Sequence, residues 1–166
     1  MIGVALRRVP WGTFVADDVR TLYDDYAIAL DDGDFTAWLE LFVADATYLV
    51  TARENVERGL PLATIRCESR DMLADRIDAL VTTQFHARRI SRHVITAIRP
   101  VESSADRLRT TANYLLVETI DGDESRVQSA GSYDDDIVMT AEGLRFARKT
   151  AIYDAALVPT SLVVPL

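Results

Sequence analysis

A change in hydrophobic periodicity near residue 90 constrains the fold of this chain more than any other feature. Before it, apolar residues recur at three- and four-residue spacing, as in amphipathic helices; after it, they alternate with polar residues, as in strands. The alternating segments are residues 93–101, 108–120, 125–140 and 144–158. Because Asp121-Gly122 and Glu142-Gly143 lie where tight hairpin turns are needed, we expect an antiparallel meander of long strands. Helices followed by such a meander predict an α+β domain whose curved sheet wraps around the N-terminal helices.

Three helices are expected in the first half of the chain. Thr13 is a plausible N-cap for a helix over residues 13–32, which Gly33 would end. Asp34 would cap a second, shorter helix, and the two together would form a helical corner. The second helix is expected to carry Phe35, Trp38, Leu39 and Phe42, with its aromatic residues in the core.

A third helix and two short strands complete the expected layout. Ser69 is predicted to cap a helix that ends near residue 83. Short strands are expected over residues 46–50 and 64–68, with a polar loop between them. The triple acid of residues 134–136 is predicted to mark a bulge or an edge of the sheet.

The length of 166 residues fits a single domain, with an N-terminal arm over residues 1–12 and the core over residues 13–166. We expect a cytoplasmic chain, because no targeting segment is visible. The apolar run over residues 155–166 is too short to span a membrane. It also holds more apolar side chains than one terminal strand can bury, which predicts an obligate oligomer.

Charge and metal-binding side chains exclude several functions. Eighteen basic and 26 acidic residues give a net charge of -8, which disfavours nucleic acid and anionic membranes as partners. The chain has one cysteine, Cys67, and two histidines, His86 and His93. A Rieske cluster needs two of each, and a mononuclear iron triad needs two further histidines and a carboxylate. We therefore expect no metal or cofactor in this chain. A single cysteine also cannot form a disulfide within the chain, and we expect Cys67 to be buried.

Several stretches together resemble one family. The segment Asp31–Phe42 matches the pattern D-D-x-x-F-x-x-W-x-x-L-F and is followed by Asp45-Ala46-Thr47-Tyr48. Further matches are Ser91-Arg92-His93, Gly131-x-Tyr133, Leu144-Arg145-Phe146-Ala147-Arg148 and Asp154. In this order they are similar to the small (beta) subunits of Rieske-type aromatic-ring-hydroxylating dioxygenases, a branch of the nuclear transport factor 2-like superfamily of cone-shaped folds.

The resemblance implies a non-catalytic structural subunit that takes part in the catabolism of aromatic compounds. In that family the alpha subunit carries the Rieske 2Fe-2S cluster, the mononuclear iron and the substrate pocket. The implied partner is such an alpha subunit, in a mixed hexamer of three alpha and three beta chains or as a homotrimer of this chain. A partner that holds the iron also explains why this chain is poor in ligands.

Five residues are candidates for a pocket or an interface: Tyr26, Trp38, Tyr48, Arg92 and His93. As a structural subunit, the chain would use them for internal hydrogen bonds or subunit contacts, and no residue would be catalytic. The alternative is a stand-alone, cofactor-free dehydratase, isomerase or cyclase in which His93 is the base, Tyr48 a phenol donor, and Asp45 or Asp31 orients the histidine. A small-ligand-binding module without chemistry is a third possibility.

Overall fold

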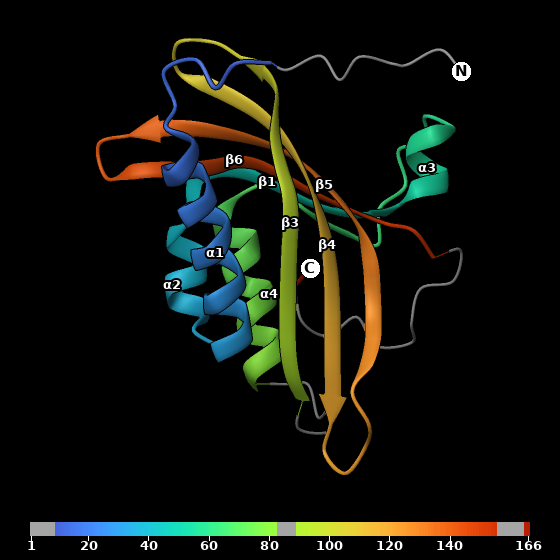
Figure 1. Ribbon diagram of the computed structural model, residues 1–166. Coiled ribbons are helices and arrows are strands. Elements are labelled where there is room, and N and C mark those ends of the chain that lie inside the picture. The colour runs from blue at the N-terminus through green and yellow to red at the C-terminus, as the bar shows by residue number, and fades with distance from the viewer. Residues whose placement is uncertain (1–8, 83–88, 156–164) are drawn as a thin grey trace.

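The computed structural model describes residues 9–82, 89–155 and 165–166. Its helices are α1 (Ala16–Asp32), α2 (Phe35–Glu40), α3 (Arg53–Glu57) and α4 (Arg70–Thr82). Its strands are β1 (Phe42–Ala52), β2 (Ile65–Cys67), β3 (Arg89–Ser103), β4 (Arg107–Ile120), β5 (Arg126–Thr140) and β6 (Gly143–Tyr153). Helices α1, α2 and α4 lie against one side of a curved sheet, which confirms the predicted α+β cone (Figure 1).

The six strands form one sheet in the order β2-β1-β6-β5-β4-β3. Strands β3 to β6 form the predicted antiparallel meander, with Gly122 and Gly143 at positive φ in its turns. Strand β1 runs parallel to β6, so the sheet is not antiparallel throughout. Gly131 is required where β5 meets β6, because a Cβ there would come within 2.0 Å of the Ile152 carbonyl oxygen.

The predicted helix caps are present at three of four positions. Gly33 ends α1 in the left-handed conformation, with φ of 71°. The carboxylate of Asp34 accepts the Ala37 N–H, and the Ser69 hydroxyl accepts the Met72 N–H.

The fourth cap and two other expectations are wrong. Helix α1 begins three residues after Thr13, whose hydroxyl instead donates to the Ala105 carbonyl in the β3–β4 turn. Phe42 opens β1 rather than closing α2. The expected polar loop begins with the short helix α3. The prediction that the acids of residues 134–136 mark a bulge or an edge is confirmed by the bulge that follows them, in β5, an interior strand.

Aromatic side chains fill the space between the helices and the concave face of the sheet. Trp38 and Phe42 are core residues, as predicted, and Cys67 is buried. Their rings and those of neighbouring tyrosines meet mostly edge to face, with centroids 5.0–6.3 Å apart. None of the helices in the described ranges is long and apolar enough to cross a bilayer.

Candidate functional site

Four of the five predicted pocket residues meet inside the cone. Tyr26 comes from α1, Trp38 from α2, Tyr48 from β1 and His93 from β3, and all four are buried. Arg92 precedes His93 on the same strand and is exposed on the opposite face of the sheet, because successive strand residues point to opposite sides. Arg92 is therefore available for surface contacts but does not line the interior.

His93 is held by Asp31, the last-turn carboxylate of α1. The His93 Nδ1 lies 2.7 Å from Asp31 Oδ1, and the backbone N–H of His93 donates to both carboxylate oxygens at 3.0 and 3.1 Å. Of the two aspartates predicted to orient the histidine, Asp31 does so and Asp45 does not. Asp45 lies exposed on β1. The aspartate and the histidine are 62 residues apart, and the packing of α1 on β3 brings them together.

Three polar side chains of the interior contact the last two residues of the sequence, Pro165 and Leu166. The hydroxyls of Tyr26 and Tyr48 donate to the backbone oxygen of Leu166 at 2.5 and 2.9 Å, and Tyr48 accepts the Leu166 N–H at 2.8 Å. His93 Nε2 lies 3.2 Å from the Pro165 carbonyl oxygen. Leu166 is fully buried within this chain, whereas the other large apolar residues of the terminal run lie outside the described residues.

Both ring nitrogens of His93 face oxygen atoms of the chain itself. A carbonyl oxygen only accepts, so a hydrogen bond to Pro165 uses a proton on Nε2. The Asp31 oxygen that faces Nδ1 also accepts the backbone N–H of His93. In this structure the imidazole therefore has no ring nitrogen left to face a substrate.

The phenols around this site stay protonated. Burial raises the pKa of Tyr26 well above its ordinary value, and the neighbouring Tyr48 raises it further. Burial is also the main cause that raises the pKa of Tyr48. Both side chains are therefore neutral hydrogen-bond donors over the physiological pH range.

A buried ion pair, which the sequence did not point to, lies deeper in the cone. Lys149 Nζ is 3.0 Å from Asp135 Oδ2, and both residues are fully buried. The same carboxylate oxygen accepts the Tyr23 hydroxyl at 2.6 Å, and the other accepts the Thr150 N–H at 3.1 Å. Burial raises the pKa of Asp135 and lowers that of Lys149; the three hydrogen bonds to the carboxylate oppose this and favour the ionised pair.

Four aromatic rings surround the ammonium group of Lys149. Its distance to the ring centroid is 3.5 Å for Tyr133, 4.2 Å for Tyr26, 4.6 Å for Phe146 and 4.9 Å for Tyr23. Ring faces attract a desolvated cation. Lys149 is also the single lysine among 18 basic residues. This count is the sequence signal that could have identified it as an unusual residue.

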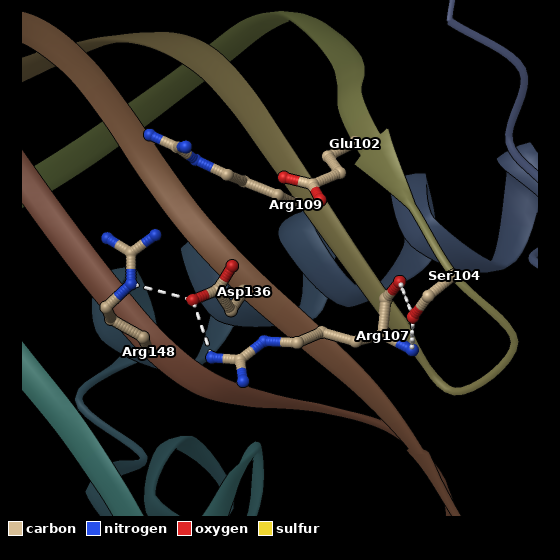
Figure 2. A pocket seen from close by; sticks show the side chains of 6 residues that line it. All are labelled: Glu102, Ser104, Arg107, Arg109, Asp136 and Arg148. Carbon is tan, nitrogen blue, oxygen red and sulfur yellow. Dashed lines mark hydrogen bonds and ion pairs between the residues drawn. The ribbon is translucent and has the colours of Figure 1, made fainter.

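Charged residues on the outer face of the sheet compensate one another. Asp136 accepts hydrogen bonds from Arg107 and Arg148, each at 2.8 Å (Figure 2). Asp134 pairs with Arg109 and Arg148. The three arginines and Asp136 line a cavity of about 310 Å³, together with Glu102 and Ser104. The lining holds three arginines and two carboxylates, and two of the arginines, Arg109 and Arg148, also pair with Asp134 beside the cavity.

The described residues contain no group of three or more histidine, cysteine or acidic side chains able to hold a metal ion. His86, the second histidine of the chain, lies outside the described residues. Cys67, the only cysteine, contacts the Met72 carbonyl oxygen at 3.9 Å and is not near a histidine partner in any described contact. The donor set therefore does not fit a Rieske cluster, which needs two cysteines and two histidines.

Comparison with known proteins identifies the family. Residues 16–150 match the SnoaL-like domain. The chain is 32% identical over 158 residues to the anthranilate 1,2-dioxygenase small subunit of Burkholderia cepacia, which covers 92% of this chain and 98% of that protein. The chain belongs to the SnoaL-like family, in its branch of aromatic dioxygenase beta subunits.

Solved structures agree with this family. A beta subunit assigned to an aromatic-ring-hydroxylating dioxygenase of Novosphingobium aromaticivorans is 33% identical, with a TM-score of 0.82 over 90% of this chain and 95% of that one. The beta subunit of benzoate 1,2-dioxygenase from Burkholderia mallei shares the fold, with a TM-score of 0.71, 16% identity, and coverage of 86% and 92%. The resemblance noted in the sequence is confirmed, as is the cone fold that it implied.

Proposed function

We propose that this dioxygenase beta subunit is non-catalytic and supports an alpha subunit that holds both iron centres, the Rieske 2Fe-2S cluster and the mononuclear iron. The observation that carries the proposal is the match to an aromatic dioxygenase small subunit over almost its whole length. The chemistry of the chain supports it, since a single cysteine and two histidines cannot supply the ligands of both centres. The mixed assembly would hold three chains of each kind.

The interior of the cone also supports a structural role. The imidazole of His93 is engaged on both nitrogens, and the Tyr26 and Tyr48 hydroxyls bond to the chain's own backbone. A general base needs a free lone pair within reach of a substrate proton. These residues instead connect α1, β1 and β3 to the end of the sequence, and so stabilise the cone that an alpha subunit would contact.

Co-expression with a large oxygenase chain tests this proposal. We expect a mixed complex that survives size-exclusion chromatography, with equal numbers of the two chains by mass measurement. His93→Ala should lower the stability or yield of the complex while the activity per assembled alpha subunit stays unchanged. Arg99→Ala, which removes an exposed side chain bonded to Thr111, is the matched control and should leave assembly unchanged.

One observation favours the second candidate, a stand-alone cone enzyme: the 2.7 Å contact between His93 and Asp31. Such a pair is able to move protons if His93 loses its contact with Pro165. This candidate predicts turnover by the purified chain alone, abolished by His93→Ala. A chain that remains alone when mixed with oxygenase alpha subunits would contradict the subunit proposal.

A further inference from the structure

Two apolar surfaces of this chain are exposed, one projecting and one hollowed. The first, which we call the lip, is formed by α3 and the loop after it, with Val56, Leu60 and Leu62. The second, which we call the hollow, lies on the outer face of the sheet around Val94 and Leu115. We propose that the lip of one copy docks into the hollow of a second copy. This contact involves copies of this chain alone, so it goes beyond the proposed function and does not depend on an alpha subunit.

The lip projects from the body of the protein. Helix α3 stands apart from the other three helices, at the ends of β1 and β6 (Figure 1). Val56, Leu60 and Leu62 are 50%, 44% and 60% exposed, and Pro61 between the leucines is exposed as well. These four neighbouring residues are not part of the core of their own chain. An exposed apolar patch of this kind is typical of a protein interaction site.

Hydrogen bonds hold the lip in one conformation. The Leu62 carbonyl oxygen accepts the Thr51 hydroxyl at 2.7 Å, and the Leu60 N–H donates to the Asn55 carbonyl oxygen at 2.8 Å. An apolar anchor that is already ordered loses little loop and side-chain entropy when it binds. The lip is therefore a fixed projection, which suits insertion into a preformed hollow.

The hollow is apolar and lies on the face of the sheet opposite to the buried core. Val94 on β3 pairs with Leu115 on β4, which pairs with Ala130 on β5. Because the neighbouring His93 and Leu116 are buried, alternation places Val94 and Leu115 on the outer face, where they are 46% and 43% exposed. These residues line a cavity of about 370 Å³. Since a cavity of about 150 Å³ holds a group the size of benzene, the hollow has room for about two leucine side chains.

Charge favours this pairing over contacts elsewhere on the surface. The chain has a net charge of -8, so two copies repel each other most where acidic surfaces meet. Residues 53–62 hold two arginines and two glutamates, of which Glu54 and Arg58 pair at 2.8 Å. At the edge of the hollow, Arg53 and Asp154 pair with each other, and the other lining residues are uncharged. Lip and hollow therefore carry no net charge, unlike the two cavities beside α1, whose linings hold an excess of acids.

The lip and the hollow are different surfaces, so each copy offers one of each. Two copies that exchange lips form a two-fold dimer, and copies joined head to tail form a ring. In either arrangement, every contact needs one intact lip and one intact hollow. This requirement distinguishes the proposed contact from a patch that pairs with itself.

Two variants test this requirement. Leu62→Glu removes the apolar anchor of the lip and Leu115→Glu the apolar floor of the hollow, both at exposed positions. In native mass spectrometry, we expect the parent chain to be an oligomer and each variant alone to associate about tenfold more weakly or worse. An equimolar mixture of the two variants should form a dimer with one chain of each kind. Val81→Glu, on the exposed side of α4, is the matched control and should associate like the parent.

The proposal is overturned if the parent chain is a monomer, if either variant keeps the parental association, or if the mixture stays monomeric. It is also overturned if Leu62→Glu still associates with itself but no longer joins an oxygenase alpha chain, since the lip would then contact the alpha subunit. A parent chain that associates with itself but not with an alpha chain would support this inference and contradict the proposed function.

Thiol labelling of Val94→Cys covers the case in which the glutamate variants do not fold. Cys67 is the only cysteine of the parent chain and is buried, so the reagent reports on position 94. At high protein concentration the lip of the second copy should protect the introduced thiol, and labelling should be about tenfold slower than at low concentration. Val81→Cys should be labelled at the same rate at both concentrations. A rate at position 94 that does not depend on concentration would refute the proposal.

Discussion

The buried pair of Lys149 and Asp135 gives the sharpest prediction for stability. Lys149→Met removes the cation but keeps a flexible apolar side chain in the aromatic cage, and so leaves the Asp135 carboxylate buried without its ion-pair partner. Breaking a fully buried pair in this way costs about 3–5 kcal/mol. With a typical urea dependence of about 2 kcal/mol per molar, the unfolding midpoint should fall by about 2 M.

The double variant Lys149→Met/Asp135→Asn distinguishes the loss of an ion pair from a loss of packing. The asparagine oxygen still accepts the Thr150 N–H, and its amide group can donate to the Tyr23 hydroxyl, which has Thr110 as a second partner at 2.8 Å. No uncompensated charge then remains buried. We expect the double variant to be more stable than Lys149→Met alone, by about 2 kcal/mol.

The pH dependence of the single variant tests the same reasoning. Burial raises the pKa of Asp135 even with Lys149 present, and removal of the lysine, which lowers this pKa, should raise it further. A carboxyl whose pKa is higher in the folded than in the unfolded state loses stability as the pH rises between the two values. The stability deficit of Lys149→Met should therefore be smallest near pH 4 and grow by up to about 1.4 kcal/mol per pH unit above it.

Urea unfolding followed by circular dichroism measures these differences. Arg109→Met, which breaks a half-exposed pair with Asp134, is the control and should cost less than about 1 kcal/mol. The reasoning is refuted if Lys149→Met is also within 1 kcal/mol of the parent at pH 7. Because Lys149 is the only lysine, acylation of its amine followed by mass spectrometry independently measures how often the cage opens.

Two further substitutions test the positions of Asp31 and Gly131. Asp31→Asn removes the charge that pairs with His93 and should cost about 2 kcal/mol in urea unfolding; no loss would mean that the pair does not stabilise the cone. Gly131→Ala places a methyl group against the Ile152 carbonyl oxygen and should lower the unfolding free energy by about 3 kcal/mol. Gly59→Ala, at a left-handed position with open space, should cost only about 1 kcal/mol.

The elements of the fold were predictable where local chemistry determines them. Asp34 and Ser69 cap helices in any context that lets their oxygens reach an N–H three residues on, and alternation determined the strands of the meander. Phe42 was assigned to a helix because its spacing from Trp38 is helical. The parallel pairing of β1 with β6 is a long-range contact, and it makes Phe42 the first residue of a strand.

The residue types of the site were predictable from the sequence, but their hydrogen-bond partners were predictable only in part. Tyrosines and a histidine on expected inward faces indicated Tyr26, Tyr48 and His93, but not which aspartate would reach the imidazole. That choice depends on how α1 crosses β3, which local sequence does not encode. Lys149 and Asp135 were missed because charged residues in a strand are usually solvent-exposed, and only the sheet register places them side by side.

The charges and donors inside the cone are largely balanced by the chain itself. Asp31 contacts the ring of His93, Asp135 pairs with Lys149, and the Tyr26 and Tyr48 hydroxyls bond to Leu166. A stand-alone acid–base enzyme needs the opposite, a titratable group with a free lone pair facing its substrate. The balance therefore supports a structural subunit.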